Sequence, residues 1–151
     1  MRDKMKLTIN AIAENEYFAR VTVAAFSVKM DPTMEELSDI KTAVSEAVTN
    51  AVVHGYDGKG GSVEIRAEIN ENWLEIEIED EGIGIDDVAQ AMEPLYTSRP
   101  EENHAGMGFS FMEAFMNDLE VTSVPGQGTK VRMCKKIEHP AAVHGKKRSI
   151  R

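Results

Sequence analysis

Five stretches of the chain have the residue pattern of β-strands. Apolar side chains fall at every second position in 5–11, 63–69 and 74–78, with polar residues between them. The stretches 119–124 and 129–137 flank the turn sequence PGQG and form a second expected hairpin, after the one that turns at 70–72. The positions that alternate with the apolar ones in 74–79 are all glutamate, which predicts a sheet with one face on a core and the other in water.

Two segments in the first third of the chain show helical periodicity instead. The segment 15–29 has an apolar side made by Phe18, Val21, Ala25 and Val28. The segment 34–54 is bounded at both ends, because Thr33 and Glu36 have the spacing of a capping box and Gly55 ends the pattern. Its sheet-packing side is expected to consist of Leu37, Ile40, Val44, Ala47, Val48 and Ala51.

A third helix is expected in 106–118, with Phe109, Met112 and Phe115 on its apolar side. The helices are separated along the chain from strands that pair mainly as hairpins. This order predicts an α+β fold, a two-layer α/β sandwich with a mainly antiparallel sheet and three main helices. No internal repeat or long linker interrupts the chain, so residues 1–138 are predicted to form a single domain.

Charge and composition narrow the class of protein. The formal net charge of −9 argues against general nucleic-acid binding, and no apolar run approaches the roughly 20 residues of a membrane helix. The N-terminal residues lack the apolar core of a signal peptide. The single cysteine, Cys134, excludes an internal disulfide and a cysteine-based zinc site, and we expect it to be a small buried residue. Together these features predict a cytoplasmic protein.

The segment 139–151 differs in charge from the rest of the chain. It has no acidic residue and contains Lys146, Lys147, Arg148 and Arg151. We interpret it as a disordered basic tail. An electrostatic contact between this tail and a partner is the alternative.

The long predicted helix carries Glu46, Asn50 and His54 at every fourth position, away from its core side. A carboxylate and an amide one turn apart can act on one bound object, because a carboxylate can accept a proton and an amide oxygen suits Mg²⁺. A solvated polar face is the simpler alternative. For His54 alone, a residue at a helix end is the simpler interpretation.

The sequence DEGIGI follows the strongest strand pattern and begins with Asp80. A carboxylate at a strand end could accept hydrogen bonds from an exocyclic amine or from water. Gly82 and Gly84 remove two side chains, which would let a flat ligand approach the backbone or permit positive φ. An ordinary turn at the end of a strand explains the same residues.

Two glycines, Gly106 and Gly108, begin the third predicted helix. Free N–H groups at a helix start bind phosphate, and glycine permits close approach. The sequence lacks the P-loop pattern, and Phe111 stands where a dinucleotide-binding motif has its third glycine. Thr129 opens the last strand, where its hydroxyl could touch a base, although threonine is also common in strands.

In order, these motifs resemble the ATP-binding signature of the GHKL superfamily, which includes gyrase, histidine kinases and MutL. The pattern is E-x-x-x-N on a helix, D-x-G-x-G after a strand, G-x-G at a helix start and G-T on a final strand, and it spans about residues 40–133. The chain is too short for the additional domains of the larger members. The stretches NEYFARVTVAAF, PLYTSRPE and GMGFSFMEAFMNDLEV narrow the resemblance to the small anti-sigma-F serine kinases of spore-forming bacilli.

The resemblance implies a Bergerat-type fold that binds ATP or ADP with Mg²⁺. Asp80 would hold the adenine amine, Gly82 and Gly84 would make room for the base, and Thr129 would lie nearby. Asn50 would coordinate Mg²⁺, and Glu46 would act as general base or orienting group for a hydroxyl. The triphosphate would be held by Gly106, Met107 and Gly108 and by a mobile lid, 93–105, with Thr97, Ser98 and Arg99.

The resemblance also implies the partners. A homodimer in the ATP state would hold a sporulation sigma factor, and the protein would phosphorylate a serine of its anti-anti-sigma protein. Arg20 would lie on the partner-binding face, although an exposed solubilising arginine is the simpler interpretation. Two alternatives remain: a nucleotide-gated binding protein without kinase activity, and a stress-response anti-sigma kinase with a different sigma factor.

Overall fold

The protein is described by a computed structural model that covers residues 1–57, 59–93 and 108–138. Four strand-and-helix groups follow one another along these residues. The first is β1 (Arg2–Asn10), α1 (Asn15–Ser27), the 3₁₀ turn η1 (Val28–Met30), α2 (Met34–Asn50) and the π-helical turn η2 (Ala51–Gly55). The others are the hairpin β2 (Ser62–Asn70) and β3 (Trp73–Asp80), the helices α3 (Val88–Ala91) and α4 (Gly108–Phe115), and the hairpin β4 (Asp118–Val124) and β5 (Gly128–Lys136).

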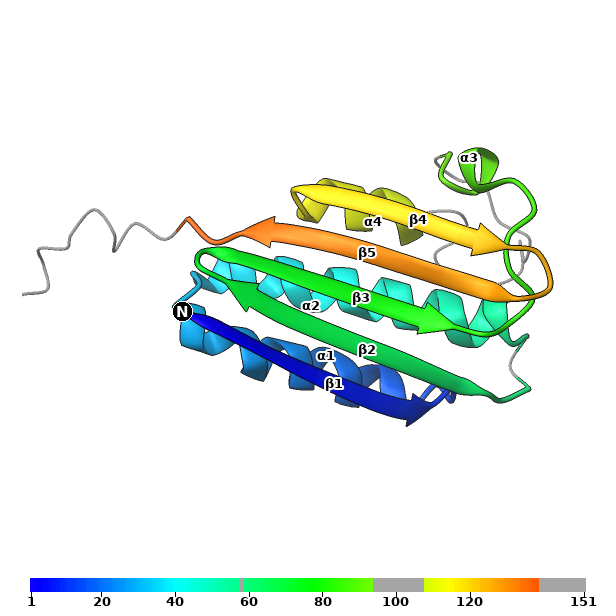
Figure 1. The fold of residues 1–151 in the computed structure, drawn as a ribbon, viewed down its shortest axis with the longest axis horizontal. Coiled ribbons are helices and arrows are strands. Elements are labelled where there is room, and N and C mark those ends of the chain that lie inside the picture. The colour runs from blue at the N-terminus through cyan, green and yellow to red at the C-terminus, as the bar shows by residue number, and fades with distance from the viewer. Residues whose placement is uncertain (58, 94–107, 139–151) are drawn as a thin grey trace, which may run out of the picture.

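The described strands form a single five-stranded antiparallel sheet in the order β1-β2-β3-β5-β4. The helices α1, α2 and α4 all cover the same face of this sheet (Figure 1). The predicted two-layer α+β sandwich is therefore confirmed, and the predicted hairpins pair as expected. The predicted domain limit at residue 138 stays a prediction, because the basic tail lies outside the described residues.

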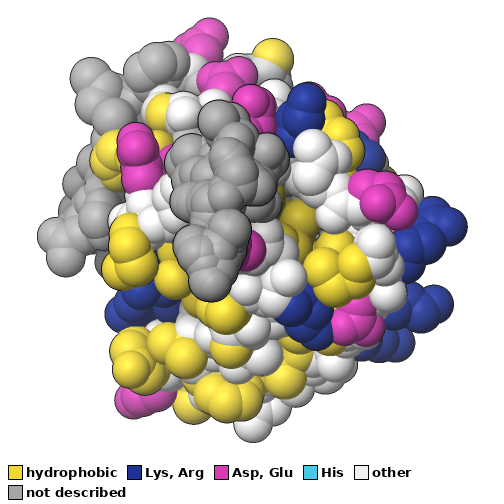
Figure 2. Space-filling model, turned by 90° about the vertical axis from the view of Figure 1, so that its left-hand side faces the viewer, with side chains coloured by type: hydrophobic (Ala, Val, Ile, Leu, Met, Phe, Trp, Pro, Cys, Tyr) yellow, Lys and Arg dark blue, Asp and Glu magenta, His cyan; other side chains and the backbone are white. Residues whose placement is uncertain are grey.

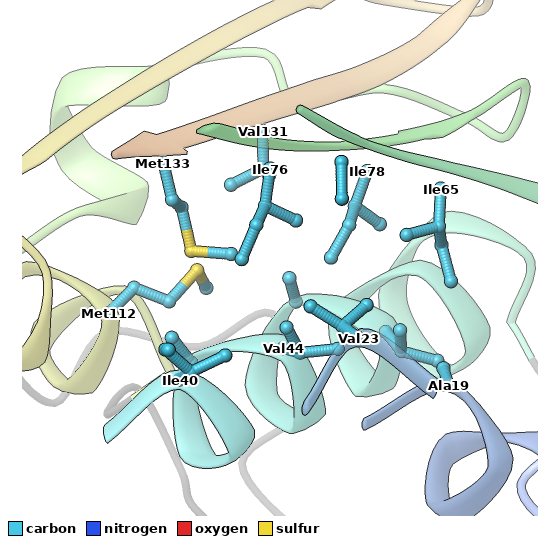
Figure 3. Packing of buried hydrophobic residues seen from close by; sticks show 14 of the residues in the cluster. Ala19, Val23, Ile40, Val44, Ile65, Ile76, Ile78, Met112, Val131 and Met133 are labelled. Carbon is cyan, nitrogen blue, oxygen red and sulfur yellow. The ribbon is translucent and has the colours of Figure 1, made fainter. Parts of the chain in front are cut away.

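The core lies between the sheet and the helices (Figure 3). The alternation read from the sequence is confirmed, since Val63, Ile65, Ala67, Ile69, Leu74, Ile76 and Ile78 are all buried. From the helix layer, Ile40 and Val44 of α2 and Met112 of α4 point toward them (Figure 3). Burying an aliphatic side chain of this size contributes roughly 1.5–3 kcal/mol, so this layer is the main source of stability.

The opposite face of the sheet is charged, as the sequence predicts. Arg66 lies at its centre, where its guanidinium donates to Glu77 at 3.0 Å and to Glu79 at 2.9 Å and also pairs with Glu64. Burial lowers the pKa of Arg66, but these three carboxylates outweigh it and the net shift is upward. The glutamates that alternate along β3 therefore have basic partners on the exposed face.

The predicted apolar side of the first helix is wrong. Phe18, Val21 and Val28 are 50%, 39% and 54% exposed, whereas Ala19 and Val23 are fully buried. The side of α1 that packs on α2 is therefore not the one predicted. Side-chain size does not decide it, because Val21 and Val23 have the same side chain; the position of α2 against α1 does. Figure 2 shows hydrophobic side chains gathered along the lower edge of the molecule, where α1 and β1 run in Figure 1.

Both ends of the long helix α2 can be compared with the prediction. At its start the capping box is confirmed, because the Glu36 N–H donates to the Thr33 hydroxyl at 3.0 Å and the Thr33 N–H donates to Glu36 at 2.9 Å. At its end the prediction is wrong by one turn, since α2 stops at Asn50 and the chain continues as the π-helical turn η2. Such π turns are rare in proteins as a whole, but those that do occur are often at functional sites.

Candidate functional site

A cavity of about 580 Å³ opens at the end of the molecule where α2 and β3 terminate. Residues of α2, η2, α4 and β5 line it, together with the turn that follows β3. Its volume falls in the range of small-molecule sites, roughly 300–1,000 Å³. Residues far apart in the sequence therefore share one hollow large enough for a nucleotide.

The cavity brings together most of the predicted site residues that the structure describes. Those that line it are Glu46, Asn50, His54, Asp80, Gly84, Gly108 and Thr129. Gly82 lies in the same turn as Gly84 but is not among the lining residues, and Arg20 lies outside the cavity. The remaining predictions fall outside the described residues: Thr97, Ser98, Arg99, Gly106 and Met107.

Asp80 lines the cavity from the end of β3. It is the last residue of β3, is only 7% exposed, and its Oδ1 accepts the Gly82 N–H at 2.9 Å. Burial raises the pKa of its carboxyl, and hydrogen bonds from the backbone of Gly82 and Thr129 only partly oppose this shift. A buried carboxylate in a cleft is a poised acceptor for a ligand donor.

The hydroxyl of Thr129, beside Asp80, belongs to a hydrogen-bond network. Its Oγ1 lies 2.9 Å from the Ser123 hydroxyl, which also accepts the Ile85 N–H at 2.7 Å. A network of hydroxyl groups thus joins β4 and β5 to the turn after β3. Ser123 is a positioning group that the sequence analysis missed, because serine in a strand gives no local signal.

The glycines of the DEGIGI turn face the protein's own backbone. A β-carbon on Gly82 would lie 2.1 Å from the carbonyl oxygen of Gly55, and one on Gly84 would lie 2.4 Å from that of Val124. Gly84 also has φ of +76°. Close backbone approach therefore accounts for both glycines, whether or not they also make room for a ligand.

Glu46 and Asn50 line the same cavity from α2. Glu46 is 7% exposed on α2, one helical turn before Asn50, so both predicted side chains reach the same hollow. A β-carbon on Gly108 would lie 3.2 Å from both terminal atoms of the Asn50 side chain. The bare Cα of Gly108 therefore lets α4 come close to this amide.

Hydrogen-bonded side chains lead from the cavity wall next to Glu46 to the surface of α1. Glu16 lines the cavity, and its Oε2 accepts the Ser45 hydroxyl at 2.5 Å and the Arg20 Nε–H at 2.6 Å. Arg20 thus lies outside the cavity, in contact with the wall residue Glu16. No sequence pattern indicates Glu16 and Ser45, since they belong to different helices and meet only in the fold.

The metal-binding capacity of the site is limited. Within the described ranges, no three His, Cys, Asp or Glu side chains gather into a group that could hold a metal ion. A single neutral amide, that of Asn50, is instead typical of Mg²⁺ sites in which phosphate oxygens supply further ligands. The donor set fits a metal that arrives with a phosphorylated ligand.

Comparison with known proteins places the chain in a family. Residues 10–135 match the histidine kinase-like ATPase domain. The anti-sigma F factor of Clostridium acetobutylicum is 57% identical over 137 residues, which cover 91% of this chain and 96% of that protein. The chain belongs to the anti-sigma F factor family. The family's member from Pasteuria penetrans is 54% identical over 139 residues, covering 91% of this chain and 93% of the relative.

Solved structures agree on the fold of this anti-sigma F factor family member. The RsbU and RsbW domains of a Mycobacterium tuberculosis protein align with a TM-score of 0.67 at 18% identity, over 91% of this chain and 33% of that one. A histidine kinase domain from Erythrobacter litoralis aligns with a TM-score of 0.52 at 21% identity, over 78% of this chain and 59% of that one.

In the described part of the chain, no helix combines the length and apolar character needed to cross a membrane.

Proposed function

We propose that the protein is an ATP-dependent anti-sigma factor of the sigma-F type that phosphorylates a serine of its anti-anti-sigma protein. The observation that carries this proposal is the shared cavity, which is lined by Asp80 and also by Glu46 and Asn50. A group that can recognise a base and groups that can act on phosphate thus line the same hollow. The proposal is also supported by relatives more than half identical to this chain that are named anti-sigma F factors.

The adenine end of the site would be organised by Asp80, with Thr129 and the turn of Gly82 and Gly84 beside it. The Asp80 carboxylate is buried, and one of its oxygens already accepts the Gly82 N–H. A carboxylate has capacity for several hydrogen bonds, so it can also accept from the exocyclic amine of adenine. If a base had a carbonyl oxygen in place of this amine, two hydrogen-bond acceptors, that oxygen and the Asp80 carboxylate, would face each other.

The phosphate end would be organised by Asn50 and the start of α4. The amide oxygen of Asn50 would hold Mg²⁺, and the backbones of Gly106, Met107 and Gly108 would hold the phosphates with Thr97, Ser98 and Arg99. Mg²⁺, when bound, neutralises charge on the phosphates during transfer. The close packing of Gly108 on Asn50 explains why a side chain is absent at this position.

Glu46 would accept the proton of the substrate serine hydroxyl or orient that hydroxyl. Its position on α2, one turn from the proposed metal ligand, supports this role, because phosphoryl transfer needs a group that positions the attacking hydroxyl near the metal-bound phosphate. Simple binding of a nucleotide would not require a buried acid here. The presence of Glu46 therefore favours a kinase over a nucleotide-gated protein that only sequesters its partner.

The proposed partners are a sigma factor, held by a homodimer in the ATP state, and an anti-anti-sigma protein, both in the cytoplasm. Arg20 would lie on the face that meets them. Its ion pair with Glu16, a cavity residue, offers a route by which a partner contact and the bound nucleotide influence each other. If Arg20→Ala leaves both partner interactions unchanged, this role is wrong.

The test is a phosphorylation assay with labelled ATP, Mg²⁺ and an anti-anti-sigma protein of the sigma-F system. We expect label on a partner serine with the wild-type protein and none with Asn50→Ala. Glu46→Gln should bind ATP as tightly as the wild type but transfer at least 100-fold more slowly, as loss of a general base implies. Glu68→Gln, on the exposed sheet face, is the matched control and should behave as the wild type.

The outcomes separate the candidate functions. ATP binding without transfer by the wild-type protein would refute the kinase and leave a nucleotide-gated sequestering protein. Equal loss of binding and transfer in Glu46→Gln would refute its catalytic role. A pull-down of partners from cells is the second measurement: capture of a stress-response sigma factor instead of the sigma-F type would refute the sporulation partner while leaving the enzyme activity intact.

A further inference from the structure

The turn after β3 is held by an uninterrupted set of hydrogen bonds. The N–H groups of Glu81, Gly82 and Ile83 donate in order to the Tyr56 hydroxyl at 2.6 Å, to Asp80 Oδ1 at 2.9 Å and to the Gly55 carbonyl at 2.9 Å. Two of these acceptors belong to adjacent residues at the end of the π-helical turn. The dipeptide 55–56 therefore determines where the residues around Asp80 lie.

Tyr56 is fixed at both ends of its side chain. Its hydroxyl donates to the Ser62 carbonyl at 2.7 Å while it accepts the Glu81 N–H, so both its donor and its acceptor functions are used. Its ring lies against the backbone of Gly61, where an added β-carbon would be 2.5 Å from the ring edge. The residue thus connects the end of η2, the start of β2 and the end of β3.

Asp80 has little room to adjust within this frame. A β-carbon on Gly55 would lie 3.1 Å from its carboxyl group, so the helix end already abuts one side of the carboxylate. The Glu81 N–H held by Tyr56 belongs to the next peptide unit along the chain. Loss of that hydrogen bond would remove one of the three contacts that hold the turn and would loosen the peptide unit next to the carboxylate.

We propose that Tyr56 is a positioning residue for base recognition, which fixes Asp80 so that its carboxylate meets the exocyclic amine of a bound adenine. This inference rests on the proposed binding of ATP. Tyr56 acts through the turn and need not touch the nucleotide. Its loss should therefore weaken the discrimination between bases more than it weakens binding in general.

The test compares ATP with inosine triphosphate, which has a carbonyl oxygen in place of the amine, using full-length wild-type and Tyr56→Phe proteins. Loss of the hydroxyl keeps the ring on Gly61 and should raise the Kd for ATP about 5–10-fold, the effect expected for one or two hydrogen bonds. The Kd for inosine triphosphate should change by less than about 2-fold, because its carbonyl oxygen offers Asp80 no donor in the place of the amine. Tyr17→Phe, at an exposed tyrosine on α1, is the control and should change neither Kd.

Two further measurements keep the outcomes distinct. In an Asp80→Asn background, Tyr56→Phe should have no additional effect on ATP binding, since it acts through Asp80. Hydrogen exchange at the Glu81 amide should be slowed in the free wild-type protein and fast in Tyr56→Phe.

An equal loss of affinity for both nucleotides, or an unchanged ATP affinity, would overturn the role of Tyr56. So would an additive effect in the Asp80→Asn background. If the wild-type protein bound neither nucleotide, the proposed function itself would fail, and the two failures are therefore distinguishable.

Discussion

Gly84→Ala tests whether the DEGIGI turn owes its glycines to the protein's own packing. Gly84 has φ of +76°, a conformation that costs an alanine about 1–2 kcal/mol. Its added β-carbon would also lie 2.4 Å from the Val124 carbonyl oxygen, so the backbone must move, which adds about 1–3 kcal/mol. The expected loss is about 2–5 kcal/mol, a large part of the roughly 5–15 kcal/mol that holds a domain together.

Gly126→Ala provides the matched control. Gly126 has φ of +81° in the turn between β4 and β5, but an added β-carbon would meet nothing within 4 Å. It should lose only the conformational cost, about 1–2 kcal/mol. Urea unfolding without nucleotide, analysed at constant m-value, measures both changes. If Gly84→Ala is no less stable than Gly126→Ala but binds ATP more weakly, Gly84 serves the ligand and the packing argument is refuted.

Three other predictions follow from single groups. Thr33→Ala removes the capping box of α2 and should lower the free energy of unfolding by about 1 kcal/mol in the same assay; an unchanged value would show that the cap is not needed. Lys135 is buried, with its ammonium 2.7 Å from the Phe115 carbonyl and 3.4 Å from Asp39, so Lys135→Ala should cost about 2–3 kcal/mol and lower Tm, whereas Lys135→Met should cost less. Burial raises the pKa of Asp80, so the folded state binds the proton of this carboxyl more tightly than the unfolded chain does. As the pH rises from the ordinary carboxyl pKa through the raised one, ionisation of Asp80 therefore lowers the stability of the fold. Asp80→Asn should therefore gain in Tm over the wild type between pH 4 and pH 7, and a gain that shrinks over this interval would contradict the sign of the shift.

Much of the fold was predictable because its strands are local patterns. A strand with one wet face must alternate, so the burial of Leu74, Ile76 and Ile78 follows from their spacing. The start of α2 was equally local, since the capping box joins Thr33 and Glu36, only three residues apart. The site residues on α2, β3 and β5 lie in short motifs that have ordinary structural interpretations one by one, and it is their order, which resembles the GHKL signature, that predicted the site.

The first helix shows where periodicity fails. The predicted side, with Phe18 and Val21, is exposed, and the buried side is that of Ala19 and Val23. Val21 and Val23 have the same side chain, so the position of α2 against α1 decides which of them is buried. A sequence records how apolar each side of a helix is, but not where the neighbouring helix lies.

The sequence by itself determined the two-layer class, the strand faces and the order of the motifs, because these depend on neighbours within a few residues. Only the tertiary structure decided that the helix before Gly55 ends in a π turn, and that Gly82 and Gly84 lie against distant carbonyls. It also decided that the hydroxyl of Tyr56 supports the turn of Asp80. These contacts join residues about 25 to 40 positions apart, and such pairs leave no periodic trace in one sequence, since only the packed backbone brings them together.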